Sequence, residues 1–484
     1  MKVNSVKQAA IINMSSKYLV IIIQLIYTAI LSRILTPEDY GIVAIINVFV
    51  NFFNVLADMG IGSAVIQRQD LGKKEVNSIF TFSCLISVAL AFVFMLLSLP
   101  ISWFYEDNVY LKLGPLLAIS VFFNTLNTVP NALLMKEKKF VLVALRQIIV
   151  AVVCSILAIM MALGGWKYYA LIIYSVLYAA FNFFWNLKNS GLALVKNIEK
   201  ESIEKIKSYS IYIFVFNIVN YFSRNLDNIV IGKFFGNRAV GNYNKAYQLM
   251  LYPTNNLARV ITPVLHPFLA GKQTDKEYLY SSFLKTAKLF SLLSVFIQSF
   301  CFFASDELVI ILYGKQWSDT MVCFRILSLS IWSQMVCTAS GAYFQALNKT
   351  DMQLRRGVVN TFIMIVGIFL GIHYKSILVV SVGVMVAYNL NFVSMLYYLL
   401  YKSFHKEIIF FLTNFIPDLI IGIGLFVGLY FISYLHISNS IIMLLVKLIL
   451  SGIIFLLLLI ATNQLKFFLQ ILPSKFKSKL KRKK

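Results

Sequence analysis

Runs of about 20 predominantly apolar residues follow one another along almost the whole chain, separated by short polar segments. In lipid, only helices and closed barrels satisfy every backbone polar group, and barrel strands would be about ten alternating residues long. The runs therefore predict an all-α integral membrane protein with about 14 transmembrane helices. The composition agrees, since 59% of the residues are hydrophobic, 13% are charged and the mean hydropathy is +0.78.

The expected spans cover nearly all of the sequence. Their boundaries lie at 11–32, 42–66, 78–103, 113–134, 141–163, 168–187, 209–232, 245–270, 284–303, 321–347, 357–373, 376–401, 409–434 and 440–461. The weakly basic N-terminal segment continues into the first span without a small-residue cleavage site, so we expect no removable signal peptide.

Lysine and arginine residues indicate the orientation, because cytoplasmic loops retain them. With the N-terminus inside, most of the 44 Lys and Arg residues fall in inner segments and in the C-terminal tail. We therefore expect both termini to be cytoplasmic. The net charge of +24 then reflects orientation, and we expect no nucleic-acid partner.

A weak internal repeat appears at an offset of 200 residues, which aligns Arg33 with Lys233 and Gly41 with Gly241. An even number of spans separates the copies, so they face the same way and predict two parallel six-helix lobes around a central cavity, an arrangement typical of transporters. The expected domains are an N-lobe at 1–187, a cytoplasmic linker at 188–208, a C-lobe at 209–401, two added helices at 402–461 and a basic cytoplasmic tail at 462–484. The tail either lies on the anionic inner leaflet or is a solvated extension.

Polar residues at helical spacing inside the spans are the most informative feature. Charges in a bilayer are costly and turn toward the bundle interior or a wet cavity, so we interpret these stripes as the lining of a central cavity; the alternative is hydrogen-bond glue between helices. Similar stripes contain Asn124, Asn127 and Asn131. The predicted substrate-binding residues are Arg224, Arg259, Arg325, Asn51, Asn54, Asn217, Asn220, Asn255, Gln24 and Tyr27.

The arginines give this expected cavity a cationic balance, which suits an anionic cargo such as a phosphate or a uronate. Asp58 and Asp227 are candidates for coupling to an ion. Asp58 is equally a candidate structural partner of a nearby Asn or Arg, and Asp227 is expected to pair with Arg224, three residues before it, and to neutralise part of its charge. Further candidates for conformational or gating roles are Arg33, Gly41, Pro253 and Pro263, the prolines because they predict kinks in the eighth span. Lys447 either serves a lipid groove or snorkels, and we favour snorkelling. Asp418 receives no role.

Signals of catalysis are missing. The sequence has no HExxH, no GxxxxGK[ST] and no DxD motif, and its four histidines lie on separate segments. The five cysteines lie in apolar stretches without metal-ligand spacing, so we interpret them as small core residues. We expect no enzyme activity, no metal and no cofactor.

Three segments resemble the bacterial polysaccharide exporters, the Wzx-type oligosaccharide flippases of the multidrug/oligosaccharidyl-lipid/polysaccharide (MOP) superfamily. They are SRILTPEDYG at 32–41, DMGIGSAVIQ at 58–67 and RNLDNIVIGKFFGNRAVGNY at 224–243. The resemblance extends over essentially the whole chain.

The resemblance implies a flippase that moves an undecaprenyl-pyrophosphate-linked oligosaccharide from the inner to the outer leaflet of the bacterial cell membrane, for capsule, O-antigen or another surface polysaccharide. It implies alternating access, coupling to Na⁺ or H⁺, and a groove at helices 13 and 14 for the lipid tail. Membrane lipids, a polysaccharide polymerase and a chain-length regulator are the implied partners of a monomer. Two alternatives stay open: a cation-coupled multidrug antiporter of the same fold, and a membrane-embedded polymerase or glycosyltransferase.

Overall fold

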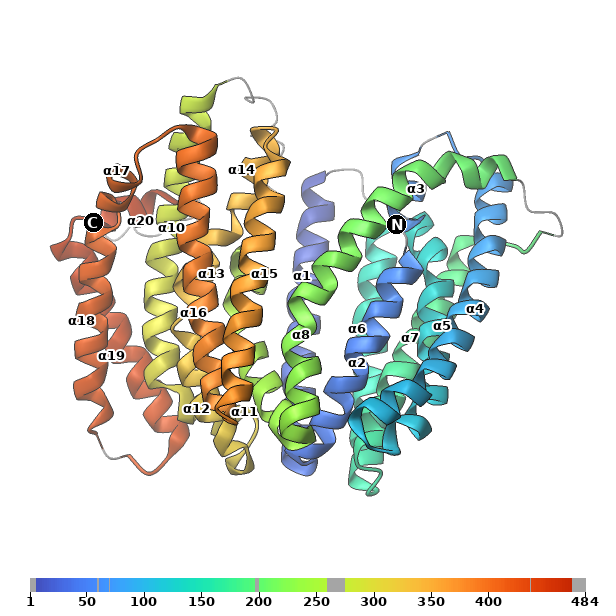
Figure 1. Cartoon of the computed structure of the whole chain (residues 1–484), viewed down its shortest axis with the longest axis horizontal. Coiled ribbons are helices and arrows are strands. Elements are labelled where there is room, and N and C mark those ends of the chain that lie inside the picture. Colours follow the sequence, from blue (N-terminus) through green and yellow to red (C-terminus); the bar gives the residue numbers. More distant parts are fainter. Residues whose placement is uncertain are drawn as a thin grey trace. The chain divides into compact units, whose positions relative to one another are not determined.

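The structure of the chain is a computed structural model, and it describes residues 6–58, 61–68, 70–195, 200–258, 275–435 and 437–471. Within helices it leaves out the side chains of residues 6–14, 58, 63, 67, 200–220, 222–224, 258, 350, 470 and 471. Every regular element in these ranges is a helix, so the predicted all-α class is confirmed (Figure 1).

The chain divides into two compact units, and unit 1 comprises Met1–Gly241 with Leu312–Gln316. Its helices differ widely in length, and most of the long ones lie roughly parallel (Figure 1). They are α1 Val6–Ile34, α2 Pro37–Asp58, α3 Ile61–Gln67, α4 Lys73–Tyr105, α5 Val109–Lys136, α6 Phe140–Leu163, α7 Tyr168–Ser190 and the larger part of α8 Lys200–Pro253.

Unit 2 comprises Asn242–Ile311 with Trp317–Lys484. After the end of α8 it contains η1 Thr254–Ala258, α10 Lys276–Phe303, α11 Ser305–Leu312, η2 Lys315–Trp317, α12 Ser318–Ser328, α13 Ile331–Thr338, α14 Ser340–Ala346, α15 Thr350–His373, α16 Ile377–Met395, η3 Leu396–Phe404, α17 Ile408–Thr413, α18 Ile416–Ser433, α19 Ser440–Ala461 and α20 Leu465–Ile471. The division falls within α8 and not in the predicted linker 188–208, and the predicted lobe boundaries stay a prediction.

Among the described residues, 11 helices are long and apolar enough to cross a membrane, and a bent pair raises the number to 12. They coincide with expected spans, which confirms a multi-pass membrane protein. Of the other two expected spans, 209–232 lies within α8, whereas 245–270 extends beyond the described residues.

The expected tenth span is bent, which the apolar pattern did not predict. Lys315–Ser328 and Ile331–Ala346 meet at an angle of 55°. Around the bend, the Ser328 hydroxyl donates to the Arg325 carbonyl at 2.7 Å and the Ser330 hydroxyl to the Leu327 carbonyl at 2.7 Å. Serine hydroxyls that bond to preceding carbonyls compete with the helical ladder and bend helices, so no proline is needed here.

The first interhelical turn is fixed by a capping box at the start of α2. The Thr36 hydroxyl accepts from the Asp39 N–H at 3.2 Å, and the Asp39 carboxylate accepts from the Thr36 N–H at 2.9 Å. Pro37 at the first helical position needs no N–H partner. The corresponding turn of the second copy is a break inside α8 at Gly236, whose φ of 79° favours glycine.

Candidate functional site

Two repeat-related glycines bring α2 and α8 into backbone contact. A Cβ atom at Gly41 would overlap the Asn237 carbonyl, and one at Gly241 would overlap the Pro37 carbonyl. The contacts are reciprocal at the offset of 200, as a pseudo-twofold axis requires. We call this arrangement the glycine contact; it supports the internal repeat and lies within unit 1.

Polar bonds flank the glycine contact. Asn237 accepts from the Tyr110 hydroxyl at 2.7 Å and donates to the Asp107 carboxylate at 3.1 Å. The Lys233 ammonium lies 2.7 Å from the Glu106 carboxylate, and this hydrogen bond and charge lower the pKa of Glu106. The ends of α4 and α5 are thereby joined to the middle of α8.

Arg33 lies at the end of α1, beside this region. Its guanidinium donates to the Ala29 carbonyl at 2.9 Å. The Gln316 amide donates to the Ser32 carbonyl and, at 2.9 Å, to the Leu35 carbonyl. The segment 312–316 therefore caps the carbonyl end of α1, which the sequence did not indicate.

The polar stripe of α2 is partly accessible. Asn51 is exposed and Asn54 half-buried, and the Asn54 side-chain oxygen has no hydrogen-bond partner in the described part of the chain. The side chain of Asp58 lies outside the described residues.

On α1, Gln24 is exposed and Tyr27 is buried. The Tyr27 ring stacks on Tyr174 with centroids 4.7 Å apart, and its hydroxyl has no partner among the described residues. This unsatisfied donor is compatible with a role in binding, which stays a prediction.

Asp227 on α8 is 3% exposed and accepts from the Asn228 N–H at 2.8 Å. The side chains of Asn217, Asn220 and Arg224 lie outside the described residues. The expected pairing of Arg224 with Asp227 therefore stays a prediction.

Pro253 ends α8, and the π-helix η1 follows, so this proline does interrupt the α-helical ladder. Asn255 lies within η1, and its side-chain oxygen is buried without a partner in the described ranges. Arg259 and Pro263 lie outside the described residues, as does His266.

Arg325 forms a bidentate pair with Asp306 at 2.8 and 2.7 Å, and it donates to the Ser305 hydroxyl at 3.0 Å. The arginine side chain remains 42% exposed, so its role in substrate binding stays a prediction.

The expectation that Lys447 snorkels is wrong. Its ammonium lies 2.6 Å from the Glu307 carboxylate and donates to the Phe303 carbonyl at 2.7 Å, and the Lys447 and Glu307 side chains are only 6% and 13% exposed. A buried carboxylate on a short helix offered the lysine a closer partner than the membrane surface. Sequence reasoning missed this because Glu307 lies between the expected spans 284–303 and 321–347, outside both.

Asp418 has a similar partner that sequence reasoning did not assign. The Lys288 ammonium on α10 donates to the Asp418 carboxylate and to the Asn414 carbonyl, each at 2.5 Å, and both charged residues are buried. Lys288 falls inside the expected span 284–303. A lysine within a span was the available signal.

Two buried arginines without a carboxylate partner in the described chain were also missed. Arg146 is the seventh residue of α6 and Arg356 the seventh of α15, and they are 5% and 9% exposed. Arg146 donates to the Asn131 amide oxygen at 3.0 Å, and Arg356 donates to that of Asn391 at 3.0 and 2.6 Å. Each unit thus buries one cation that an asparagine from a neighbouring helix holds.

Asparagines of α5 serve mainly in hydrogen bonds to neighbouring helices. Asn131 accepts from Arg146, and Asn127 accepts from the Asn186 amide at 2.7 Å. This confirms the hydrogen-bond interpretation for the stripe of the fourth span. The Arg146 Nε and the Asn186 oxygen nevertheless stay buried without partners among the described atoms.

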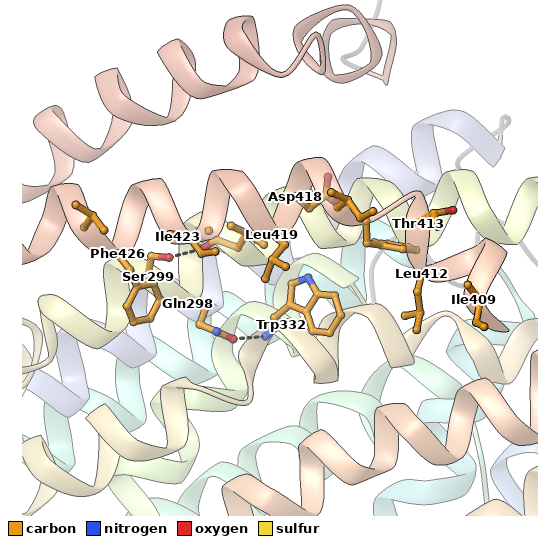
Figure 2. A pocket seen from close by; sticks show the side chains of 15 residues that line it. Gln298, Ser299, Trp332, Ile409, Leu412, Thr413, Asp418, Leu419, Ile423 and Phe426 are labelled. Carbon is orange, nitrogen blue, oxygen red and sulfur yellow. Dashed lines mark hydrogen bonds between the residues drawn. The ribbon is translucent and has the colours of Figure 1, made fainter.

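An apolar groove of about 790 Å³ lies in unit 2, against α10, α13, α17 and α18. Figure 2 shows its lining side chains in a row, from Phe426 at one end past Trp332 to Ile409 at the other. Trp332 is held by a bond from its N–H to Gln298 at 3.0 Å and from its indole to Ser291 at 2.9 Å. Nearly all of the lining is hydrocarbon, so the groove suits an aliphatic chain.

The described residues contain no group of three or more His, Cys, Asp or Glu side chains arranged to hold a metal ion. The arrangement offers hydrogen bonding, buried cations and an apolar groove.

Comparison with known proteins gives this arrangement a context. A family described as polysaccharide biosynthesis protein matches residues 30–322. An uncharacterized membrane protein in the cps region of Klebsiella pneumoniae is 23% identical over 444 residues, which cover 89% of this chain and 86% of that protein. The lipopolysaccharide biosynthesis protein WzxC of Escherichia coli (strain K12) is 21% identical over 377 residues, covering 76% and 75%.

Among solved structures, the lipid II flippase MurJ in an inward closed conformation is similar with a TM-score of 0.72. The match covers 94% of this chain and 99% of that chain at 15% sequence identity. This likeness confirms the predicted MOP-type fold.

Proposed function

The chain belongs to the polysaccharide biosynthesis protein family, and from this premise we propose that it is a flippase for lipid-linked oligosaccharides. Its cargo is an undecaprenyl-pyrophosphate-linked repeat unit, which it carries from the inner to the outer leaflet for capsule, O-antigen or another surface polysaccharide. The glycan must be shielded from hydrocarbon while the lipid tail stays in the bilayer. A flippase therefore needs polar and apolar surfaces on one protein.

The apolar groove of unit 2 carries the proposal. It lies on α18, at the expected helix 13, where the family resemblance implies a groove for the lipid tail. A water-soluble cargo has no use for a hydrocarbon-lined groove of about 790 Å³, whereas a polyprenyl chain does.

The charge of the cargo agrees with the buried cations. Arg146 and Arg356 each add a positive charge without a carboxylate partner in the described chain. Such charges attract a diphosphate electrostatically even where they do not touch it. Arg224, Arg259 and Arg325 are proposed to contact the cargo directly, with the asparagines of the predicted stripes and Gln24 and Tyr27.

We propose alternating access, with the glycine contact and Arg33 at the gate that closes in this conformation. Pro253 lies where α8 changes to the π-helix η1 and is a proposed bending point, as is Pro263. Asp58 and Asp227 are the proposed sites of coupling to Na⁺ or H⁺. The proposed location is the bacterial cell membrane, with both termini in the cytoplasm and a polymerase and chain-length regulator as partners of a monomeric flippase.

A deletion strain tests the proposal. Without the protein, lipid-linked repeat units should accumulate on the inner leaflet and surface polysaccharide should disappear, and a plasmid copy should reverse both. Normal surface polymer in the deletion strain, without another exporter, would exclude this function. Loss of surface polymer without accumulated repeat units would place the protein at another step.

A further inference from the structure

A second pocket lies next to the apolar groove. A second pocket of about 560 Å³ is lined by Tyr401, Lys402, His405, Lys406, Glu407, Ile408 and Ile409. Ile409 lines both pockets, so they adjoin at this residue. Figure 2 shows Ile409 at the end of the groove, beyond Leu412. A pocket with charged side chains in its lining therefore adjoins the apolar groove within unit 2.

The lysines of this second pocket are held in place by aromatic rings. The Lys402 ammonium lies 5.6 and 5.5 Å from the ring centroids of Tyr397 and Tyr401. Lys406 pairs with Glu277 and lies 5.3 Å from the Tyr280 ring. Cation–π contacts orient the Lys402 ammonium without neutralising it, so it can still bind an anion, whereas the Lys406 ammonium is also balanced by the Glu277 carboxylate.

The backbone around these lysines is also specialised. They flank the end of η3, a nine-residue π-helix that closes with His405 in the left-handed region at φ 57°. The Lys406 N–H caps the Leu400 carbonyl at 3.0 Å. Left-handed backbone at a residue other than glycine and π-helical turns both concentrate at functional sites.

We propose that this pocket is the loading site for the diphosphate of the polyprenyl-linked cargo, with the polyprenyl chain in the adjoining groove. The inference rests on the proposed function and locates the headgroup before it is translocated. Lys402 and Lys406 supply two positive charges against Glu407 in the lining and Glu277, the ion-pair partner of Lys406. An ammonium group has three N–H donors, so both lysines keep donors that can hydrogen-bond a diphosphate. A single apolar groove matches a single-chain lipid better than a phospholipid with two acyl chains.

Binding to the purified full-length protein in detergent tests the site. Undecaprenyl pyrophosphate is the probe, undecaprenol its phosphate-free counterpart and phosphatidylglycerol the competing lipid. Lys402→Gln with Lys406→Gln should weaken binding of the diphosphate about thirtyfold, since each lysine near the surface contributes about 1 kcal/mol. Binding of undecaprenol should not change, which also shows that the groove is folded.

Two variants make the result specific. Lys276→Gln with Lys285→Gln removes two exposed charges from α10 without touching the pocket and should leave the affinity unchanged. Glu407→Gln removes the acidic lining group and should tighten binding. Equal weakening in the Lys276/Lys285 variant, no change in the Lys402/Lys406 variant, or displacement of the probe by equimolar phosphatidylglycerol would each overturn the proposal.

The loading site and the proposed function can fail separately. If the wild-type protein restores surface polymer but does not bind undecaprenyl pyrophosphate, the loading site is wrong and the flippase stands. If binding behaves as expected but the deletion strain exports normally, the pocket binds a polyprenyl diphosphate for another purpose.

Discussion

At the scale of single residues, the fold depends on glycines where two helices touch and on arginines buried inside each unit. At the glycine contact, two helices approach so closely that their backbones touch. At Arg146 a buried guanidinium donates to Asn131, and at Arg356 one donates to Asn391 and to the Ser340 hydroxyl. Both features depend on residues far apart in the sequence.

Gly41→Ala should impair export, because its methyl group would meet the Asn237 carbonyl and neither backbone has room to move away. We expect a destabilisation of about 1–3 kcal/mol, typical of overpacking. Surface polymer and the melting temperature of the purified protein give the measurement. Gly452→Ala is the matched control, since a Cβ atom at Gly452 meets nothing within 4 Å. Equal behaviour of the two variants would show that the glycine contact is dispensable.

Arg224→Ala or Arg259→Ala should abolish surface polysaccharide while the protein still inserts, because each removes a predicted contact to the anionic cargo. Immunoblots of the membrane fraction give the protein level, and polymer staining gives the export. Normal polymer from both variants at matched protein levels would remove these arginines from the binding site.

At the scale of single residues, the sequence indicated which residues are special better than it indicated which residues they contact. Gly41 and Gly241 were found by the offset of 200, and the glycine contact then brought them together. Lys447 was misjudged because snorkelling depends on the residue alone, whereas pairing depends on Glu307, 140 positions away. Arg146 and Arg356 received no role because they lie at the ends of the expected spans 141–163 and 357–373, where hydropathy does not tell a buried arginine from one in a loop.

Among the elements, α18 and α19 are joined to the rest of unit 2 by buried ion pairs near opposite ends. Lys288 of α10 pairs with Asp418 of α18, and Lys447 of α19 pairs with Glu307 of α11. Between the pairs the contact is apolar, including Leu292 against helices α18 and α19. Lipid tails are as apolar as these side chains, so the ion pairs, and not the apolar contact, specify the register.

Lys447→Met should destabilise the protein by about 3–5 kcal/mol, because it leaves the Glu307 carboxylate buried without its partner. Lys447→Met with Glu307→Gln should recover most of that loss. Thermal unfolding of the purified protein measures both variants. A double variant as unstable as Lys447→Met alone would mean that packing of the lysine stem, and not the charge pair, holds α19.

The helices themselves were predictable because a bilayer demands long apolar runs, and these runs are visible in any single sequence. The breaks and bends within these helices were harder to predict. The break at Gly236 shortens the expected connection after the seventh span to a kink inside α8, and the bend after Ser328 arises from serine back-bonding that hydropathy does not register.

For the whole molecule, the proposed alternating-access cycle has the glycine contact separate and re-form. The polar bonds around it join the ends of α4 and α5 to α8 in the present conformation. Every round of export would therefore break and remake the same small set of bonds.

Asp107→Cys with Asn237→Cys, joined by a short bis-methanethiosulfonate cross-linker, should lock this conformation, because the Asp107 carboxylate oxygen and the Asn237 amide nitrogen that the cysteines replace lie 3.1 Å apart. Cross-linking should stop export, and a reductant that releases the cross-linker should restore it. Each single cysteine variant is the control for the loss of one hydrogen bond. Undiminished export with complete cross-linking would show that this region does not open. The native cysteines are free, and four of the five are buried.

The buried arginine of α6 has a consequence for biogenesis. A helix with an unpaired guanidinium costs about 2.5–3.5 kcal/mol to place at the centre of a bilayer on insertion scales. Its acceptor, Asn131, belongs to the preceding helix α5, which emerges from the ribosome first. The translocon should therefore release α5 and α6 into lipid together as a helical hairpin. Helix α5 should stay at the lateral exit of the translocon until α6 has been synthesised.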